Sequence, residues 1–120
     1  MSQYKKVRSF PRTVAYDVPH ETKPNQFVRR TFDARFQQFS NSDLGRIQES
    51  LNGDADFLSH IIEDGSLKNI PVPGAEEPTH SEQLAVLQED VVMLSAAIND
   101  YFNALKGDPA RGNSKRSPAR

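Results

Sequence analysis

The sequence predicts a mainly α-helical fold in which short helices precede one long C-terminal helix, and both ends of the chain are extended or disordered. Apolar residues within 79–106 recur at alternating intervals of three and four residues. Phenylalanines within 25–39 recur at intervals that gather most of them on one helical face. Both patterns are typical of amphipathic helices. With 120 residues, the chain has room for one small domain.

Residues 1–24 are predicted to form an extended basic arm. The arm contains Pro11, Pro19 and Pro24, which disfavour a helix, and a short alternation of apolar and polar residues at 13–18. Such a segment can add a strand to the sheet edge of another protein. Disorder of the isolated arm is the alternative.

Residues 25–68 are predicted to form short helices. The first carries the phenylalanine stripe over 25–39. The second begins at an N-cap within 41–43 and ends near Gly53, and the third begins at Asp54 and stops at Gly65. Helices of this length are marginal alone, so we expect them to pack on one another, on the last helix or on a partner.

A proline-containing connector at 69–78 separates this region from the long helix at 79–106. Thr79 and Glu82 form a capping-box pattern at its start, and Gly107 is a typical C-terminal stop. At 1.5 Å per residue the helix would be about 40 Å long. Its apolar positions form an unbroken heptad seam, suited equally to a bundle within the chain and to a homodimer or another protein. The seam comprises Leu84, Leu87, Val91, Leu94, Ile98, Tyr101 and Leu105.

The net charge of −1 hides a strong segregation of charge along the chain. Residues 1–30 hold seven cations and two acids, residues 31–105 three cations and thirteen acids, and residues 106–120 five cations and one acid. Each region therefore presents its own local field to a partner. The predicted partner-binding residues are Lys5, Lys6, Arg8, Phe10, Arg12, Tyr16, Phe27, Phe32 and Phe36. A disordered basic tail at 107–120 would add Arg111, Lys115, Arg116 and Arg120.

The chemistry of common enzymes is absent from the sequence, and we expect neither catalysis nor a cofactor. There is no Gly-rich phosphate loop, no His-Glu-x-x-His motif, no Gly-x-Ser-x-Gly elbow and no cysteine. Asp56, His60 and Glu63 have ligand-like spacing on one helix. A solvated acidic face explains that spacing better than a metal site does. No segment is apolar enough to span a membrane, and we expect a cytoplasmic protein.

The chain resembles the internal scaffolding proteins of gokushoviruses, which are small single-stranded DNA phages. The similar features are the basic start at 6–10, the acidic proline-containing connector at 71–78, and a late helix that ends in an aromatic residue and an Asp-Pro-Ala run at 101–110. The sequence departs from the family pattern at 32–36, where an Asp-Ile-Asn type of signature would be expected. The resemblance implies a non-enzymatic protein that binds viral coat subunits in the bacterial host cytoplasm during procapsid assembly.

The sequence therefore predicts a scaffold or adaptor for the assembly of a larger complex, with phage procapsid assembly as its specific form. The alternative is a small nucleic-acid-binding regulatory or packaging protein whose basic ends contact phosphates. A metal-dependent hydrolase built on His60 is a further rival.

Overall fold

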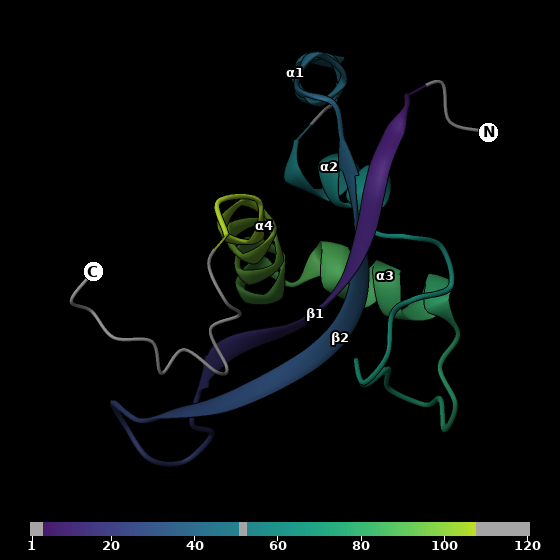
Figure 1. Cartoon of the computed structure of the whole chain (residues 1–120). Coiled ribbons are helices and arrows are strands. Elements are labelled where there is room, and N and C mark those ends of the chain that lie inside the picture. The colour runs from purple at the N-terminus through teal and green to yellow at the C-terminus, as the bar shows by residue number, and fades with distance from the viewer. Residues whose placement is uncertain (1–3, 51–52, 108–120) are drawn as a thin grey trace.

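In the part of the chain that the structure describes, a long antiparallel β-hairpin and four short helices form the fold (Figure 1). The structure, a computed structural model, describes residues 4–50 and 53–107. In chain order its elements are β1 (Lys6–Pro19), β2 (Phe27–Phe39), α1 (Asn41–Ser50), α2 (Asp54–Ile61), α3 (His80–Glu89) and α4 (Val91–Leu105). The fold of these residues is α/β, and the prediction of a mainly α-helical fold with one long C-terminal helix is wrong.

The segment predicted as an extended arm is β1, and its strand partner lies in its own chain. β1 and β2 run antiparallel in continuous register from Arg8 opposite Gln38 to Pro19 opposite Phe27. The alternation at 13–18 correctly indicated extended structure. The partner that the arm requires is the next element of the chain, with no second protein needed.

The segment predicted as a Phe-rich helix is β2. Phe36 follows Phe32 by four positions. Residues at this spacing share one face of a helix, because four residues make about one turn, and they equally share one face of a strand, where side chains repeat every two residues. Pairing with β1 selects the strand, because both rings then face the helices and are fully buried. Aromatic residues also favour strands through such cross-strand packing.

The outer edge of β2 is hydrogen-bonded to the loop after α2, whereas the outer edge of β1 carries two prolines. Asp33 exchanges backbone hydrogen bonds with Lys68, and the backbone carbonyl of Arg35 accepts from Glu63. Because backbone groups alternate in direction along a strand, these residues are not hydrogen-bonded to β1. Pro11 lies opposite Arg35, and Pro19 lies an even number of residues further along. Both prolines therefore stand where an N–H would point away from β2, the position that a strand tolerates.

The two short helices α1 and α2 occur in the predicted region, but their caps differ from the predicted ones. Ser40 precedes α1, and its hydroxyl accepts from the backbone N–H of Asp43 at 3.2 Å. Gly53, with φ of 113°, is the N-cap of α2 and makes no side-chain cap bond. Asp54 is the first helical residue, where its charge suits the positive end of the helix dipole.

The connector holds no helix or strand, as predicted, and it is fixed by α3. Gln83 is 5% exposed. Its Nε2 donates to the carbonyls of Leu67 and Pro78 at 3.2 Å each, while its Oε1 accepts from the backbone N–H of Ile70 at 3.0 Å. The predicted capping box is confirmed at the start of α3, with Thr79 as N-cap.

The predicted rod over 79–106 is wrong, because the chain breaks at Asp90. This residue is extended, with φ of −101° and ψ of 110°, and its carboxylate caps α4 by accepting from the backbone N–H groups of Val92 and Met93. A short acidic side chain competes with helix continuation by bonding nearby backbone donors in this way. The predicted C-terminal stop is confirmed, because α4 ends at Leu105 and Gly107 has φ of 90°.

The break also disrupts the predicted heptad seam. Leu87 and Tyr101 are fully buried, whereas Val91 is 72% exposed. The remaining members, Leu84, Leu94, Ile98 and Leu105, are partly buried against the core. The seam residues therefore do not form one continuous docking edge, and the homodimer predicted from that edge loses its basis.

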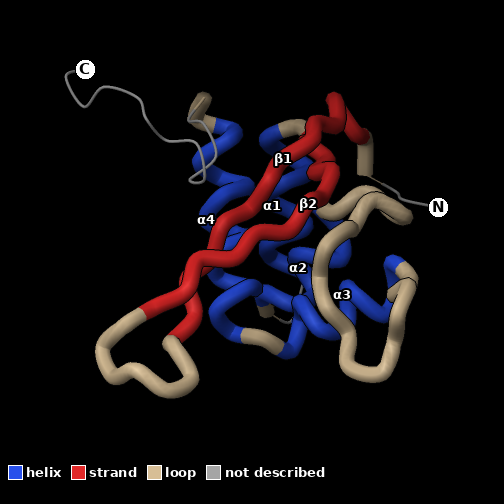
Figure 2. Tube along the Cα trace, turned by 90° about the horizontal axis from the view of Figure 1, so that it is seen from below, coloured by secondary structure: helices blue, strands red, loops and turns tan. Residues whose placement is uncertain are grey.

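One hydrophobic core lies between the inner face of the hairpin and the helices (Figure 2). Phe36 from β2 and Phe57 from α2 both meet the ring of Tyr101 from α4, at centroid distances of 5.4 and 5.9 Å. The turn end of the hairpin projects beyond this core in both views (Figures 1 and 2). Residues 21–27 at that end are all exposed.

Candidate interaction surface

The buried polar groups of the described residues serve the fold. Asp100 on α4 is 2% exposed and accepts two hydrogen bonds from the Arg12 guanidinium on β1, at 2.7 and 2.8 Å. The Tyr101 hydroxyl donates to the carbonyl of Gln37 at 2.9 Å, and burial raises the pKa of Tyr101 to about 12. These groups already bond one another. They offer no free acid, base or nucleophile of the kind that catalysis requires.

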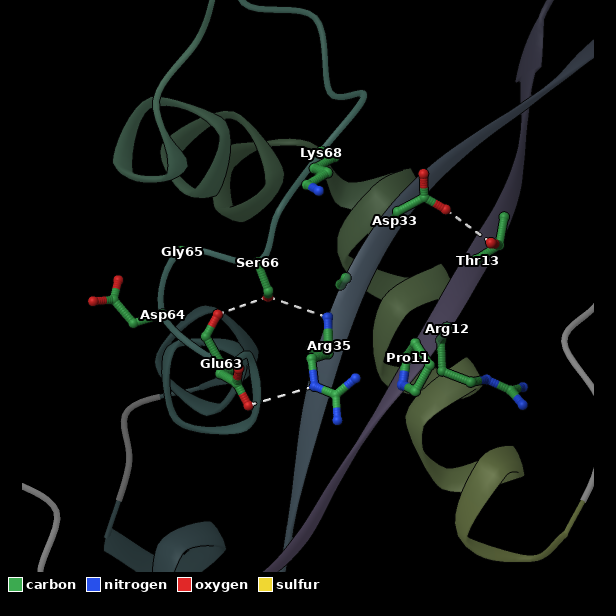
Figure 3. A pocket seen from close by; sticks show the side chains of 11 residues that line it. Pro11, Arg12, Thr13, Asp33, Arg35, Glu63, Asp64, Gly65, Ser66 and Lys68 are labelled. Atoms are coloured by element: carbon green, nitrogen blue, oxygen red, sulfur yellow. Dashed lines mark hydrogen bonds and ion pairs between the residues drawn. The ribbon is translucent and has the colours of Figure 1, made fainter.

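The largest hollows are open. One of about 800 Å³ lies beside β1, β2 and the loop after α2 (Figure 3). Asp33 there accepts from the Thr13 hydroxyl at 2.8 Å, and Arg35 pairs with Glu63 at 3.7 Å. Arg12 borders the hollow but its side chain points away from these groups, toward α4 (Figure 3). Charges of both signs compensate one another here, so this hollow has no strong preference for an ion.

The predicted helix face with Asp56, His60 and Glu63 does not assemble a metal site. Within residues 4–50 and 53–107, no three side chains of the metal-binding types are grouped closely enough to hold an ion. His60 instead packs edge-on against the ring of Tyr4 at 6.0 Å. Glu63 is engaged with Arg35.

The predicted partner-binding residues divide into two groups. Phe32, Phe36 and Tyr16 are buried in the core, and Phe10 and Arg12 are partly buried against α4. These five residues hold the hairpin on the helices and are not available as predicted. The exposed group comprises Lys5, Lys6, Arg8 and Phe27. The predicted tail residues Arg111, Lys115, Arg116 and Arg120 lie outside the described residues.

The first strand and the last helix meet at a surface that we name the basic end. Its residues are Lys5 directly before β1, Lys6, Val7 and Arg8 at the start of β1, and Lys106 after α4. Between the two elements lies a hollow of about 300 Å³, lined by Arg8 from one side and by Leu105 and Gly107 from the other. Two cationic segments almost one hundred residues apart in the sequence thus border one depression.

Contacts with α1 fix the start of this surface. The backbone N–H of Lys5 donates to the Asp43 carboxylate at 3.0 Å, and this bond holds the pKa of Asp43 below its usual range. The same carboxylate accepts from Arg46 at 2.7 Å. Arg8 bonds the amide oxygen of Gln38 at 2.8 Å. The Asp43 carboxylate is therefore already bonded, and the cations of the basic end give the surface a positive field.

Val7 makes the basic end amphipathic. It is 47% exposed in the middle of the cationic segment, and it is one of three large hydrophobic side chains exposed in the described part of the chain. An apolar centre ringed by charges is typical of protein-binding patches. Val7 and Lys106 were not among the interaction residues predicted from the sequence. The register of β1 against β2 is irregular between Lys6 and Arg8, where Val7 lies, and this irregularity depends on the pairing with β2.

A scan against protein-family models, a search of curated proteins and a search of solved structures each found no match to the chain. None of the four helices in the described ranges is long and apolar enough to cross a membrane.

Proposed function

We propose that the protein is a non-enzymatic adaptor that assists assembly of a larger complex, and that it binds an acidic surface of a protein partner through its basic end. The supporting observation is the hollow that joins Arg8 of β1 to Gly107 after α4. Arg8 lines this hollow, Lys5 and Lys6 precede Arg8 in the chain, and Lys106 lies between the lining residues Leu105 and Gly107. The chain continues from Gly107 into residues 108–120, which contribute four more cations in sequence.

The chemistry of the basic end suits reversible binding. Exposed cations steer an acidic partner into contact and add specificity more than affinity, and each exposed ion pair contributes little. Val7 and the half-buried Phe10 supply a small apolar contact beneath them. A partner held by several weak contacts can be released once assembly is complete.

The narrower form of the proposal is a scaffold for phage procapsids that binds coat subunits, which rests on the resemblance to gokushovirus scaffolding proteins. The test is cosedimentation of the purified chain with assembling coat protein. The variant Lys6→Glu/Arg8→Glu is compared with Lys23→Glu/Arg30→Glu, which changes net charge equally at exposed positions of the hairpin's turn end. We expect the first variant to lose binding by roughly tenfold or more and the second to bind like the parent. Equal effects of both variants, or none, would contradict the role of the basic end.

Nucleic-acid binding is the second candidate, because the same cations can contact phosphates. Affinity for single-stranded DNA at about 0.1 M and about 0.3 M salt distinguishes the two candidates. Tight binding with a steep salt dependence, abolished by Lys6→Glu/Arg8→Glu, would favour the nucleic-acid function. Weak binding to DNA together with retained binding to coat protein would favour the adaptor.

A further inference from the structure

Two side chains of α3 hold the backbone of the loop between α2 and α3. Gln83 Nε2 donates to the carbonyl of Leu67 at 3.2 Å, and His80 Nδ1 accepts from the N–H of the same residue at 3.2 Å. Residues with the spacing of His80 and Gln83 lie on one face of a helix. Leu67 is 3% exposed, and this pair bonds both of its backbone polar groups. One of the two side chains is an amide, which does not titrate, and the other is an imidazole, which does.

The bond to Leu67 sets the form of the His80 ring. A ring nitrogen accepts a hydrogen bond only when it carries no proton, so the neutral ring holds its proton on Nε2. Protonation of Nδ1 gives an imidazolium in which both nitrogens are donors, and the N–H of Leu67 then faces another donor. Water cannot readily replace the lost acceptor, because Leu67 is buried and the His80 side chain is only 14% exposed. A buried N–H without an acceptor destabilises the structure that contains it.

The charges around His80 do not offset this loss. Its Nε2 lies 3.7 Å from the Asp64 carboxylate, but the Asp64 side chain is fully exposed, so water screens the attraction. Lys68 and Glu76 line the same hollow as His80 and oppose each other in sign. His80 is also the first residue of α3, where a positive charge meets the positive end of the helix dipole. Glu82, the acid in that first turn, is already bonded in the capping box.

The loop that His80 holds covers the outer edge of β2. It runs beside β2 in Figure 2, and Lys68 exchanges backbone hydrogen bonds with Asp33 at 2.9 and 3.0 Å. Asn69 adds a side-chain bond to the Asp33 carboxylate at 2.5 Å. The carbonyl of Leu67 and the N–H of Lys68 belong to one planar peptide unit. Displacement of Leu67 therefore also displaces the N–H that Lys68 donates to β2.

We propose that His80 is a pH-sensitive switch: its neutral ring holds the loop at 66–69 against α3 and β2, and its protonation releases that loop from the edge of β2. His20 provides a contrast within the same chain. Its Nδ1 accepts from the backbone N–H groups of Thr22 and Lys23 at 3.1 Å each, but in the exposed turn of the hairpin water can take over those bonds. The switch therefore depends on the histidine whose acceptor nitrogen is shielded from water.

Amide hydrogen exchange of the full chain, followed by NMR at about pH 7.5 and about pH 5.5, tests the proposal, because this interval spans the titration of histidine and lies above that of ordinary carboxylates. After correction for the intrinsic exchange rate at each pH, protection of the Leu67 and Lys68 amides should fall roughly tenfold at the lower pH. Opening of the loop then takes up one proton, and one pH unit changes a one-proton equilibrium tenfold. The amide of Leu94, bonded to the carbonyl of Asp90, reports global opening and should not change. Protection of Leu67 that is the same at both pH values would overturn the proposal.

Substitutions identify the group that titrates. His80→Asn keeps an acceptor oxygen near the position of Nδ1 and should protect Leu67 equally at both pH values, whereas His80→Phe keeps a ring without an acceptor and should lower protection at both. His60→Asn is the matched control, because the His60 ring packs against Tyr4, and it should respond to pH like the parent. A response that survives in His80→Asn, or is lost in His60→Asn, would assign the effect to another group and refute the switch. If His80→Phe does not fold, the parent and His80→Asn decide the outcome.

Discussion

The ion pair between β1 and α4 provides the sharpest test of how the hairpin is held. Asp100→Ala removes a carboxylate that is 2% exposed and bonds the Arg12 guanidinium at 2.7 and 2.8 Å. The Arg12 side chain is only 12% exposed. In the variant its positive charge therefore stays largely shielded from water and has lost the Asp100 carboxylate. Removing one partner of a buried pair typically costs about 3–5 kcal/mol. We expect the free energy of unfolding to fall by that amount.

The exposed pair Asp17–Arg29 is the matched control. It joins the same hairpin through bonds of 2.9 and 3.3 Å, but its side chains are 37% and 48% exposed. Asp17→Ala should therefore cost far less stability than Asp100→Ala. The double variant Arg12→Met/Asp100→Leu should recover most of the loss, because apolar replacement of a buried pair is often neutral or stabilising.

Urea unfolding followed by circular dichroism measures these differences. With a slope near 1–3 kcal/mol per molar urea, Asp100→Ala should lower the midpoint by about 2 M, and Asp100→Asn provides a milder variant if the alanine variant does not fold. A cost for Asp100→Ala no larger than that for Asp17→Ala would refute the reasoning. So would a double variant less stable than Asp100→Ala.

Three further predictions concern single side chains. Tyr101, with its pKa raised from 10.0 to about 12, is favoured in its neutral form by folding. The folded state binds more protons than the unfolded state between these values, so this group should lower stability by about 2 kcal/mol as pH rises from 10 to 12. Tyr101→Phe should reduce the step in unfolding titrations and leave the part due to Tyr16, whose pKa burial also raises. Thr79→Ala should cost about 1 kcal/mol in urea unfolding, since it removes the N-cap of α3. Gln83→Leu should cost about 1–3 kcal/mol and speed proteolysis of the connector, because the buried N–H of Ile70 loses its acceptor.

Local signals in the sequence predicted local structure well. The capping box at Thr79, the proline-containing connector and the stop at Gly107 all depend on residues within a few positions, and all three are present. The break at Asp90 also has a local signal, an Asp followed by two β-branched valines, but the regular spacing of leucines on both sides obscured it.

Pairing between distant segments could not be predicted in this way. The spacing of Phe32 and Phe36 suits either a helix or a strand, and only the register with β1 decides between them. The bond from Arg12 to Asp100 spans 88 positions. A hint exists in the acid between the buried Ala97 and Tyr101, because a carboxylate on an apolar face requires a partner. Which residue pairs with this carboxylate can be known only from the fold.

The placement of the prolines in β1 has a consequence for behaviour at high concentration. A two-stranded sheet with an unpaired edge strand is a template to which strands of further molecules can pair, as in amyloid. At Pro11 and Pro19 an incoming chain would find no donor, and Lys6 and Arg8 would repel an identical neighbour. We therefore expect the molecule to remain free of fibres at high concentration.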